Sequence, residues 1–195
     1  MRKLLIGLGV PLMVALPVFA LDGKNITFQK DKVGADAKTF SAIIGMWSIE
    51  KDGPRQVYSV NGQKWKQGSL SPGAVEKAME MFGPESAVFV KNIAAYKEFP
   101  LSICKDCSAF SNGTITVSFK AIAGNEDQAA GIALNIKPGS EYLAVRANAF
   151  ENNLVLFTFE KEKRKSLQWA ENAPTKSNVW HVLSVSVKGK RSRHF

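Results

Sequence analysis

Apolar and polar residues alternate with a period of two through much of the second half of the chain. Ile115, Val117 and Phe119 are each separated by a Thr or a Ser, which is typical of a strand with one buried and one solvated face. The alternation returns in four later segments, with apolar positions at Ile132, Leu134 and Ile136; Leu143, Val145, Ala147 and Ala149; Val155, Phe157 and Phe159; and Leu183, Val185 and Val187. Consecutive strands of this kind predict an all-β fold.

Turn residues separate these strands. Gly, Asn, Asp, Pro and Ser are concentrated at residues 124–127, 138–140 and 151–153. Strands that follow one another through such short links are antiparallel. The pattern therefore predicts an antiparallel sandwich in one domain, since 195 residues suit one well-filled core better than two.

The first half of the chain has a different pattern. Residues 22–70 mix Gly, Lys and Asp with short apolar pieces, which indicates short strands joined by turns. Ser71 and Pro72 then precede apolar positions at helical spacing, and Gly83 and Pro84 follow them. A capping serine, a first-turn proline and a glycine stop predict one short helix here.

The amino terminus has the layout of a secretory signal. Arg2 and Lys3 precede an apolar run from Leu4 to Phe19, and small or apolar residues lead to a cleavage point after Ala20. The run is shorter than the roughly 20 residues of a spanning helix and contains two prolines. We expect residues 1–20 to be a signal peptide, residues 21–195 to be the mature domain, and the protein to be secreted or periplasmic, with no membrane segment after cleavage.

The chain carries a formal net charge of +9, which weakly favours acidic partners. Its basic residues form two separate clusters, at residues 161–165 and 188–193, without interleaved aromatic residues that would stack on bases. We therefore expect a solvated turn and tail at these positions and no nucleic-acid partner.

One strand has a face that suggests ligand binding. Tyr142, Arg146 and Asn148 lie opposite its apolar positions, and Asn135 lies on the non-apolar face of the preceding strand. An aromatic ring, a guanidinium and amides on one sheet face suit a polar ligand such as a sugar. The alternative is an ordinary solvated sheet face in which Arg146 pairs with a nearby carboxylate.

Three segments carry a resemblance to a known family: Asp127 to Asn135, Tyr142 to Phe157 and Trp180 to Gly189. Together they resemble the concanavalin A-like, laminin G-like jelly-roll domains, near the branch related to 3-keto-disaccharide hydrolases and family 16 glycosidases. The resemblance extends over roughly residues 99–191. It implies a two-sheet jelly roll with a concave face suited to glycans, and an exported bacterial protein.

The most recognisable segment of that family contains four residues here, Arg146, Asn148, Glu151 and Asn153. Two roles are open for them, ligand binding and folding. The expected fold class is thus an all-β, antiparallel two-sheet jelly-roll sandwich, concanavalin A-like, with one short helix.

The chain departs from the family in two respects. Glycosidases of this architecture place two carboxylates about 5 Å apart, commonly from a Glu-x-Asp-x-x-Glu strand, and no such spacing occurs here. No catalytic residues are therefore expected. The segment after Lys188 is also short compared with the family, so we expect the last strands of the sandwich to be missing, which would leave an open strand edge.

Cys104 and Cys107 form a C-x-x-C pair. In an oxidising compartment they suit a short-loop disulfide, while free thiols and a redox or metal-binding pair are the alternatives. No metal site is expected, although Asn125, Glu126 and Asp127 would suit a calcium ion if they are more than a turn.

Trp47, Trp65 and Trp169 are candidate sugar-stacking platforms, or else packing residues. His181, at the start of the last strand, has no assignable nucleophile and is interpreted as a strand-entry residue rather than a base.

These features together predict an exported, lectin-like domain that binds a glycan or another polar extracellular ligand and needs no cofactor. A glycoside or 3-keto-glycoside hydrolase and a structural or adhesive surface module are the alternatives.

Overall fold

The computed structural model describes residues 23–62, 66, 68–107, 110–124 and 127–188. The predicted signal peptide lies outside these ranges, as does Trp65. The segment after Lys188, where the family has the closing strands that were expected to be missing here, also lies outside them. In the part of the chain that is described, no helix is long and apolar enough to cross a membrane.

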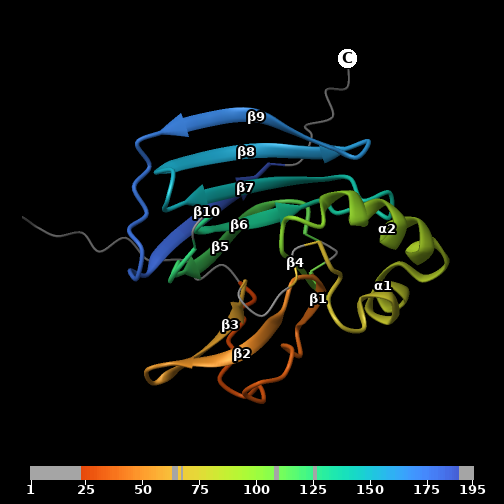
Figure 1. The fold of residues 1–195 in the computed structure, drawn as a ribbon, viewed down its shortest axis with the longest axis horizontal. Coiled ribbons are helices and arrows are strands. Elements are labelled where there is room, and N and C mark those ends of the chain that lie inside the picture. Colours follow the sequence, from red (N-terminus) through yellow and green to blue (C-terminus); the bar gives the residue numbers. More distant parts are fainter. Residues whose placement is uncertain (1–22, 63–65, 67, 108–109, 125–126, 189–195) are drawn as a thin grey trace, which may run out of the picture.

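A four-stranded antiparallel sheet forms the centre of the molecule (Figure 1). Its strands are β6 (Ala129–Leu134), β7 (Tyr142–Asn148), β8 (Asn153–Glu160) and β9 (Lys163–Glu171), and they lie in sequence order. Successive side chains point to opposite faces, so each of the two faces of this central sheet has its own apolar set.

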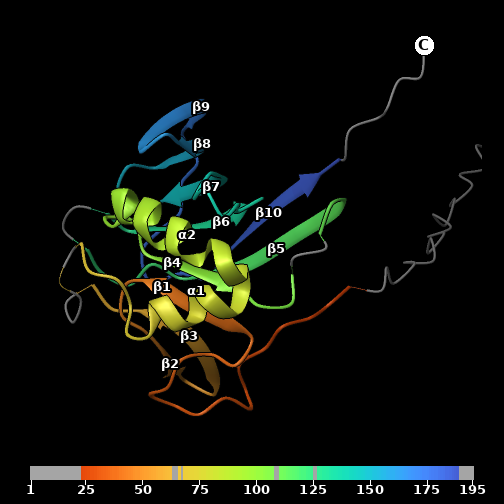
Figure 2. The ribbon, with the colours of Figure 1, turned by 90° about the vertical axis from the view of Figure 1, so that its right-hand side faces the viewer.

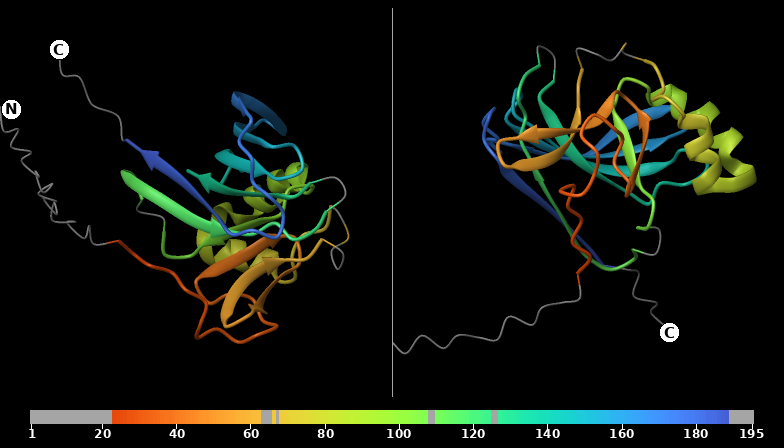
Figure 3. Two further views of the ribbon diagram at one scale, coloured as in Figure 1. Left: turned by 90° about the vertical axis from the view of Figure 1, so that its left-hand side faces the viewer. Right: turned by 90° about the horizontal axis from the view of Figure 1, so that it is seen from below.

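One face packs against a two-stranded ribbon, formed by β5 (Gly113–Phe119) and β10 (His181–Val187). Phe119 and Leu183 of the ribbon are buried against Ile132 and Ala147 of the sheet. The outer side of the ribbon carries the polar positions, which pair as hydroxyls across the two strands. Figures 2 and 3 show the ribbon extending beyond the sheet. The packing of the ribbon on the sheet confirms the antiparallel all-β sandwich that the alternation predicts.

The other face of the central sheet is also covered. The strand pair β1 (Phe40–Ile44) and β4 (Leu101–Cys104) and the helices α1 (Ala74–Phe82) and α2 (Ser86–Ile93) bury their apolar residues against it. The cluster contains Ile43, Ile44, Phe89, Ile93 and Leu101 on one side and Tyr142, Val155, Phe157 and Phe159 on the other. Much of the face of β7 that was expected to be solvated is therefore part of the hydrophobic core.

The predicted helix is α1, and a short 3₁₀ turn joins it to α2, which the sequence analysis did not include. Period two was expected from Ala87 onward, so that residues 87–93 were predicted to be extended. The buried residues Ser86, Phe89 and Ile93 instead recur three and four positions apart, which is the spacing of one helix face.

A second hairpin, β2 (Trp47–Asp52) and β3 (Arg55–Val60), lies beside the ribbon. Near its turn, Asp52 accepts hydrogen bonds from the Lys120 amine at 2.5 and 2.6 Å and from the Trp180 indole at 3.0 Å. The Arg55 guanidinium lies 5.7 Å from the centre of the Trp180 ring. Lys120 directly follows β5 and Trp180 directly precedes β10, and His181 pairs with Phe119. These contacts therefore attach the hairpin to one end of the ribbon.

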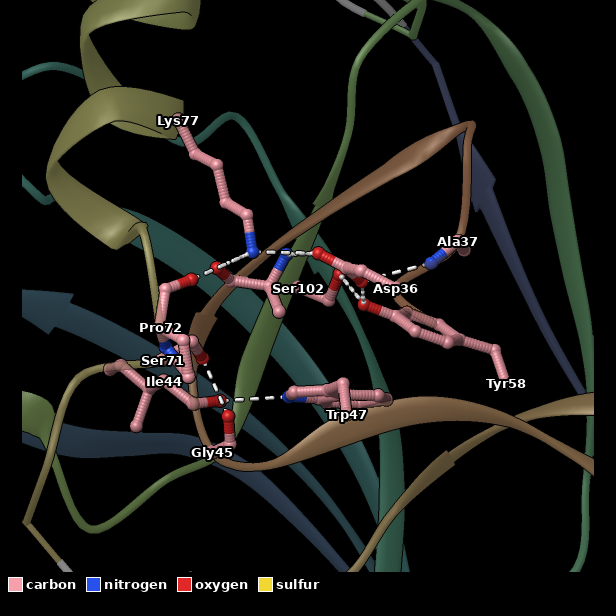
Figure 4. Close-up of polar contacts among 11 residues, drawn as sticks. Asp36, Ala37, Ile44, Gly45, Trp47, Tyr58, Ser71, Pro72, Lys77 and Ser102 are labelled. Atoms are coloured by element: carbon pink, nitrogen blue, oxygen red, sulfur yellow. Dashed lines mark hydrogen bonds and ion pairs between the residues drawn. The ribbon is translucent and has the colours of Figure 1, made fainter. Parts of the chain in front are cut away.

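A half-buried carboxylate, Asp36, joins the other side of this hairpin to α1 and β4 (Figure 4). Lys77 of α1 donates to it at 2.7 Å, and the Tyr58 hydroxyl of β3 donates to its second oxygen. The same hydroxyl lies 3.2 Å from Ser102 of β4. Three elements that do not share a sheet therefore meet at one carboxylate.

The protonation of Asp36 follows from these contacts. Burial acts to raise the pKa of its carboxyl, but hydrogen bonds from Lys77 and Tyr58 outweigh burial and hold the pKa below the ordinary 3.8. Burial and the adjacent carboxylate raise the pKa of Tyr58 well above its usual range. Asp36 thus stays ionised and Tyr58 stays a donor at neutral pH.

We predict that Asp36→Asn lowers the free energy of unfolding at neutral pH by about 2–4 kcal/mol, because it leaves the Lys77 ammonium partly buried without its counter-charge. A carboxyl with a lowered pKa stabilises the fold fully above the unfolded-state value and loses that effect as the pH falls through the folded-state value. The wild-type advantage over the variant should therefore shrink in acid, as urea unfolding across the pH range would measure.

The matched control is Asp106→Asn, which removes an exposed pair with Lys24 at 3.5 Å. Exposed pairs of this kind contribute about 0–1 kcal/mol. Equal effects of the two substitutions would contradict a special role for Asp36.

Candidate functional site

Tyr142, a predicted ligand residue, belongs to the core. Only 5% of its surface is exposed, its ring stacks on Phe159 at 4.2 Å between centroids, and burial raises the pKa of its hydroxyl. The prediction of a solvated position is corrected here because β1, β4 and the helices cover this end of the sheet.

Asn135 is also separated from the other candidates. It follows β6 with a φ of 54° and is exposed. In the β6–β7 register Leu134 pairs with Leu143, whereas Ala129 pairs with Asn148. Asn135 and Asn148 therefore lie at opposite ends of the sheet, roughly 20 Å apart at about 3.3 Å per residue.

The remaining candidates do come together, at the end of the sheet where β7 finishes and β8 begins. Arg146 donates to Glu151 at 2.5 Å, to Asn153 at 3.1 Å and to Asp127 at 3.4 Å. Its side chain is 17% exposed, and its guanidinium lies 5.4 Å from the centre of the Phe157 ring. Arg146 is thus the hub of the polar cluster, and its Nε, which is buried, has no partner among the described residues.

Asn148 is a buried residue that connects the segments around this cluster. It is fully buried, and its side-chain oxygen accepts from the backbone amides of Phe150 at 2.9 Å and Gln128 at 3.4 Å. Its amide nitrogen donates to Asp127 at 2.5 Å. Contrary to the expectation of a solvated position, Asn148 ties the turn after β7 to the segment before β6, and its side chain faces no solvent.

Glu151 is held as a carboxylate. A hydrogen bond from the Asn153 amide at 2.9 Å, together with the Arg146 guanidinium, keeps the pKa of Glu151 below its usual value despite partial burial. Asn153 itself is 3% exposed. The Arg146 hub therefore fixes the orientation of both side chains.

An open hollow of about 500 Å³ lies next to this cluster. It is bounded by the turn between β7 and β8 on one side and the end of β9 on the other, where Asn152 and Asn172 both adopt left-handed backbone conformations. Asparagine tolerates these conformations better than most residues. The lining residues are Glu151, Asn152, Asn153, Trp169, Glu171 and Asn172.

Of the residues that the structure describes, Trp169 is the only aromatic one that lines this hollow, and 47% of its surface is exposed. In the β8–β9 register it lies opposite Val155, and Glu171 lies opposite Asn153. Both side chains therefore project from the same face as Arg146, whose strand partner is also Val155. Trp169 was a candidate from the sequence, but Asn152, Glu171 and Asn172 were missed, because no strand was predicted over residues 163–171. The spacing of two between Trp169 and Glu171 is the signal that could have placed them on one strand face.

Trp47 serves packing instead. Its indole donates to the Ile44 carbonyl at 2.8 Å, and its ring lies 4.9 Å from that of Tyr58. Of the two interpretations made from the sequence, a sugar-stacking platform and a packing residue, the second therefore applies to Trp47.

Two other candidate sites have local structural contacts. Cys104 and Cys107 form a disulfide at the end of β4. His181 begins β10, where its ring lies 3.0 Å from the Lys176 carbonyl and 5.6 Å from the ring centre of Phe119.

For calcium, Asn125 and Glu126 lie outside the described residues, and the Asp127 carboxylate accepts from Arg146 and Asn148. Within the described ranges, no three His, Cys, Asp or Glu residues gather at a point that would hold a metal ion.

The strands and their packing define an antiparallel, mainly β protein with a polar cluster and an open hollow at one edge of its central sheet. No protein-family model matches the chain, and no curated protein matches it. Among solved structures, the chain is similar to carbohydrate-binding module CBM66 from Bacillus subtilis, with a TM-score of 0.48 and 15% sequence identity, over 77% of this chain and 69% of that one. A likeness at this level assigns neither a family nor a ligand.

We predict that Asn148→Ala lowers the free energy of unfolding by about 2–3 kcal/mol, because two backbone amides and a carboxylate lose a buried partner. Chemical denaturation would measure the change. Asn135→Ala is the control, since an exposed asparagine should change stability by less than about 0.5 kcal/mol. A stable Asn148→Ala protein would show that the asparagine does not hold the turns.

Proposed function

We propose that the protein is a carbohydrate-binding domain and that its ligand occupies the hollow between the β7–β8 turn and the end of β9. The observation that carries this proposal is Trp169, a half-exposed indole in a hollow whose other lining residues are carboxylates and amides. An aromatic face provides an apolar surface for the C–H side of a sugar ring, while carboxylates and amides satisfy its hydroxyls. An orienting set of polar groups around an apolar surface is typical of a small-molecule site.

The Arg146 hub supports the same proposal. Glu151 and Asn153 are held by the guanidinium before any ligand arrives. Side chains that are already ordered lose less conformational entropy on binding, which increases affinity. The cluster is thus suited to present acceptors to ligand hydroxyls in a fixed geometry.

Binding is favoured over hydrolysis by the state of Glu151. Glycoside hydrolysis requires one carboxyl that donates a proton and so needs a raised pKa. The contacts of Glu151 lower its pKa and engage its carboxylate with Arg146 and Asn153. This arrangement suits a hydrogen-bond acceptor and not an acid.

We also propose that the protein is exported, on the basis of the signal-like residues 1–20. A disulfide between Cys104 and Cys107 fits an oxidising compartment. Sequencing the amino terminus of the secreted or periplasmic protein should find Leu21 first, and an uncleaved amino terminus on cell-associated protein would contradict export.

The binding proposal predicts that Trp169→Ala weakens glycan binding at least tenfold while the melting temperature stays close to that of the wild type. The indole is half exposed, so its removal costs little packing, whereas a buried aromatic contact with a ligand is worth more than about 1.4 kcal/mol, or tenfold in affinity. Glycan-array screening of the wild type, followed by calorimetric titration of both proteins with the best oligosaccharide, would measure the effect.

The matched control is Leu167→Ala, which removes a similarly exposed apolar side chain of the same strand from outside the hollow. Binding should be retained in this variant. Loss of binding in both variants, or in neither, would argue against the hollow as the site.

A further inference from the structure

We infer that the hollow selects glycans that carry an ammonium group, such as amino sugars, over glycans that carry carboxylates or sulfates. This inference rests on the proposed function, since it concerns the ligand class of the same site. Two observations support the inference: the carboxylates around the hollow, and the hydrogen bonds that the Arg146 guanidinium already makes to Asp127, Glu151 and Asn153.

The hollow is acidic although the chain is basic. Glu151 and Glu171 line it, and Asp127 lies behind it. Among the described residues, Arg146 is the one cation in direct contact with these groups. Three carboxylates against one guanidinium leave a formal charge of −2, in a chain whose net charge is +9. The local field therefore repels anionic sugars and attracts cationic ones.

Arg146 is not free to receive an anion. Its two terminal nitrogens already donate to Asp127, Glu151 and Asn153, and the side chain is largely buried over Phe157. A sugar carboxylate would have to displace the Glu151 carboxylate at 2.5 Å. The Arg146 guanidinium therefore orients the side chains of the site but has no terminal nitrogen without a partner to donate to the carboxylate of a uronic acid.

Glu171 is the acceptor that remains available. It is exposed at the end of β9, lies opposite Asn153, and has no side-chain partner among the described residues. A sugar ring that stacks on Trp169, two residues earlier on the same strand face, would bring a ring substituent within reach of this carboxylate. An ammonium there gains a charge-assisted hydrogen bond and lies beside the indole face, which also attracts cations.

The basic residues of β9 are directed elsewhere. The Arg164 guanidinium lies between the rings of Phe99 and Phe157, at 4.4 and 4.8 Å from their centres. Lys165 pairs with Thr158, on the opposite face of the sheet from Trp169. Arg164 shares the face of the hollow but pairs with Phe159, four residues along β8 from Val155, the partner of Trp169. At about 3.3 Å per residue this is roughly 13 Å along the strand, so a longer anionic chain would be needed to reach it.

The test is calorimetric titration of the mature protein with three oligosaccharides of equal length: a glucosamine oligomer, its N-acetylated counterpart and an oligouronate. In mildly acidic buffer both the amines and the carboxylates are charged. We expect the tightest binding for the glucosamine oligomer, weaker binding for the N-acetylated one and the weakest for the uronate. Added salt should narrow the differences, because exposed charges are screened.

Glu171→Gln should reduce the preference for the glucosamine oligomer over its N-acetylated counterpart by about two- to fivefold, the contribution of one exposed charge pair. Glu160→Gln, which makes the same change at the far end of β8, should leave the ratio as in the wild type.

Equal or tighter binding of the uronate, or a ratio that Glu171→Gln does not alter, would overturn the charge selectivity and leave the proposed function standing. Failure of all three oligosaccharides and of the array to bind, with the protein folded, would overturn the proposed function itself.

Discussion

The pairing of Arg146 within a largely apolar sheet face is the interaction on which the site depends. Both faces of the central sheet are covered, by the ribbon on one side and by β1, β4 and the helices on the other. A guanidinium that enters such a face must be paired, because an unpaired buried charge costs several kcal/mol. Asp127, Glu151 and Asn153 meet that requirement. These contacts fix the turn between β7 and β8 and the segment before β6, and the β7–β8 turn forms one wall of the hollow.

Half-buried ion pairs also attach the peripheral elements. Among the described residues the β2–β3 hairpin shares no sheet with another strand. Two backbone hydrogen bonds join Ile49 of β2 to Gly34 and Ala35, directly before Asp36. Asp36 connects the β3 strand of the hairpin to α1 and β4, and Asp52 connects the hairpin turn to the ribbon through Lys120 and Trp180. Directional pairs of this kind specify one arrangement where apolar contact alone would allow several.

The hollow owes its character to the edge strand β9. Every residue of this strand is exposed, so its side chains are free to differ in chemistry from one end to the other. The first half carries the basic residues, with Arg164 committed to two aromatic rings, and the second half carries Trp169 and Glu171. A site at a sheet edge has open access for a long chain, and the covered interior of the same sheet holds its inner wall rigid.

Local periodicity and turn chemistry determined much of the fold from the sequence. Period-two alternation located β5 to β8 and β10, and a serine, proline and glycine pattern located α1, because each of these elements presents its own apolar face whatever lies opposite. The alternation did not locate β9: the basic residues 161–165 were expected to form a solvated turn, but a strand begins at Lys163. The grouping of Arg146, Asn148, Glu151 and Asn153 came from the resemblance to the jelly-roll family, in whose most recognisable segment all four lie. Which side of β7 faces solvent was not determined, because a sheet covered on both faces has apolar or neutralised residues on both. Tyr142 and Asn148 were therefore placed outside when they lie inside, and α2, whose Val88–Val90 run suits a strand, was missed. Only the tertiary structure decided that Trp169 and Glu171 border the Arg146 cluster. No strand was predicted over residues 163–171, where every residue is exposed and no apolar face marks a strand, and a bulge between Leu156 and Phe157 shifts the β8–β9 register before it reaches Trp169.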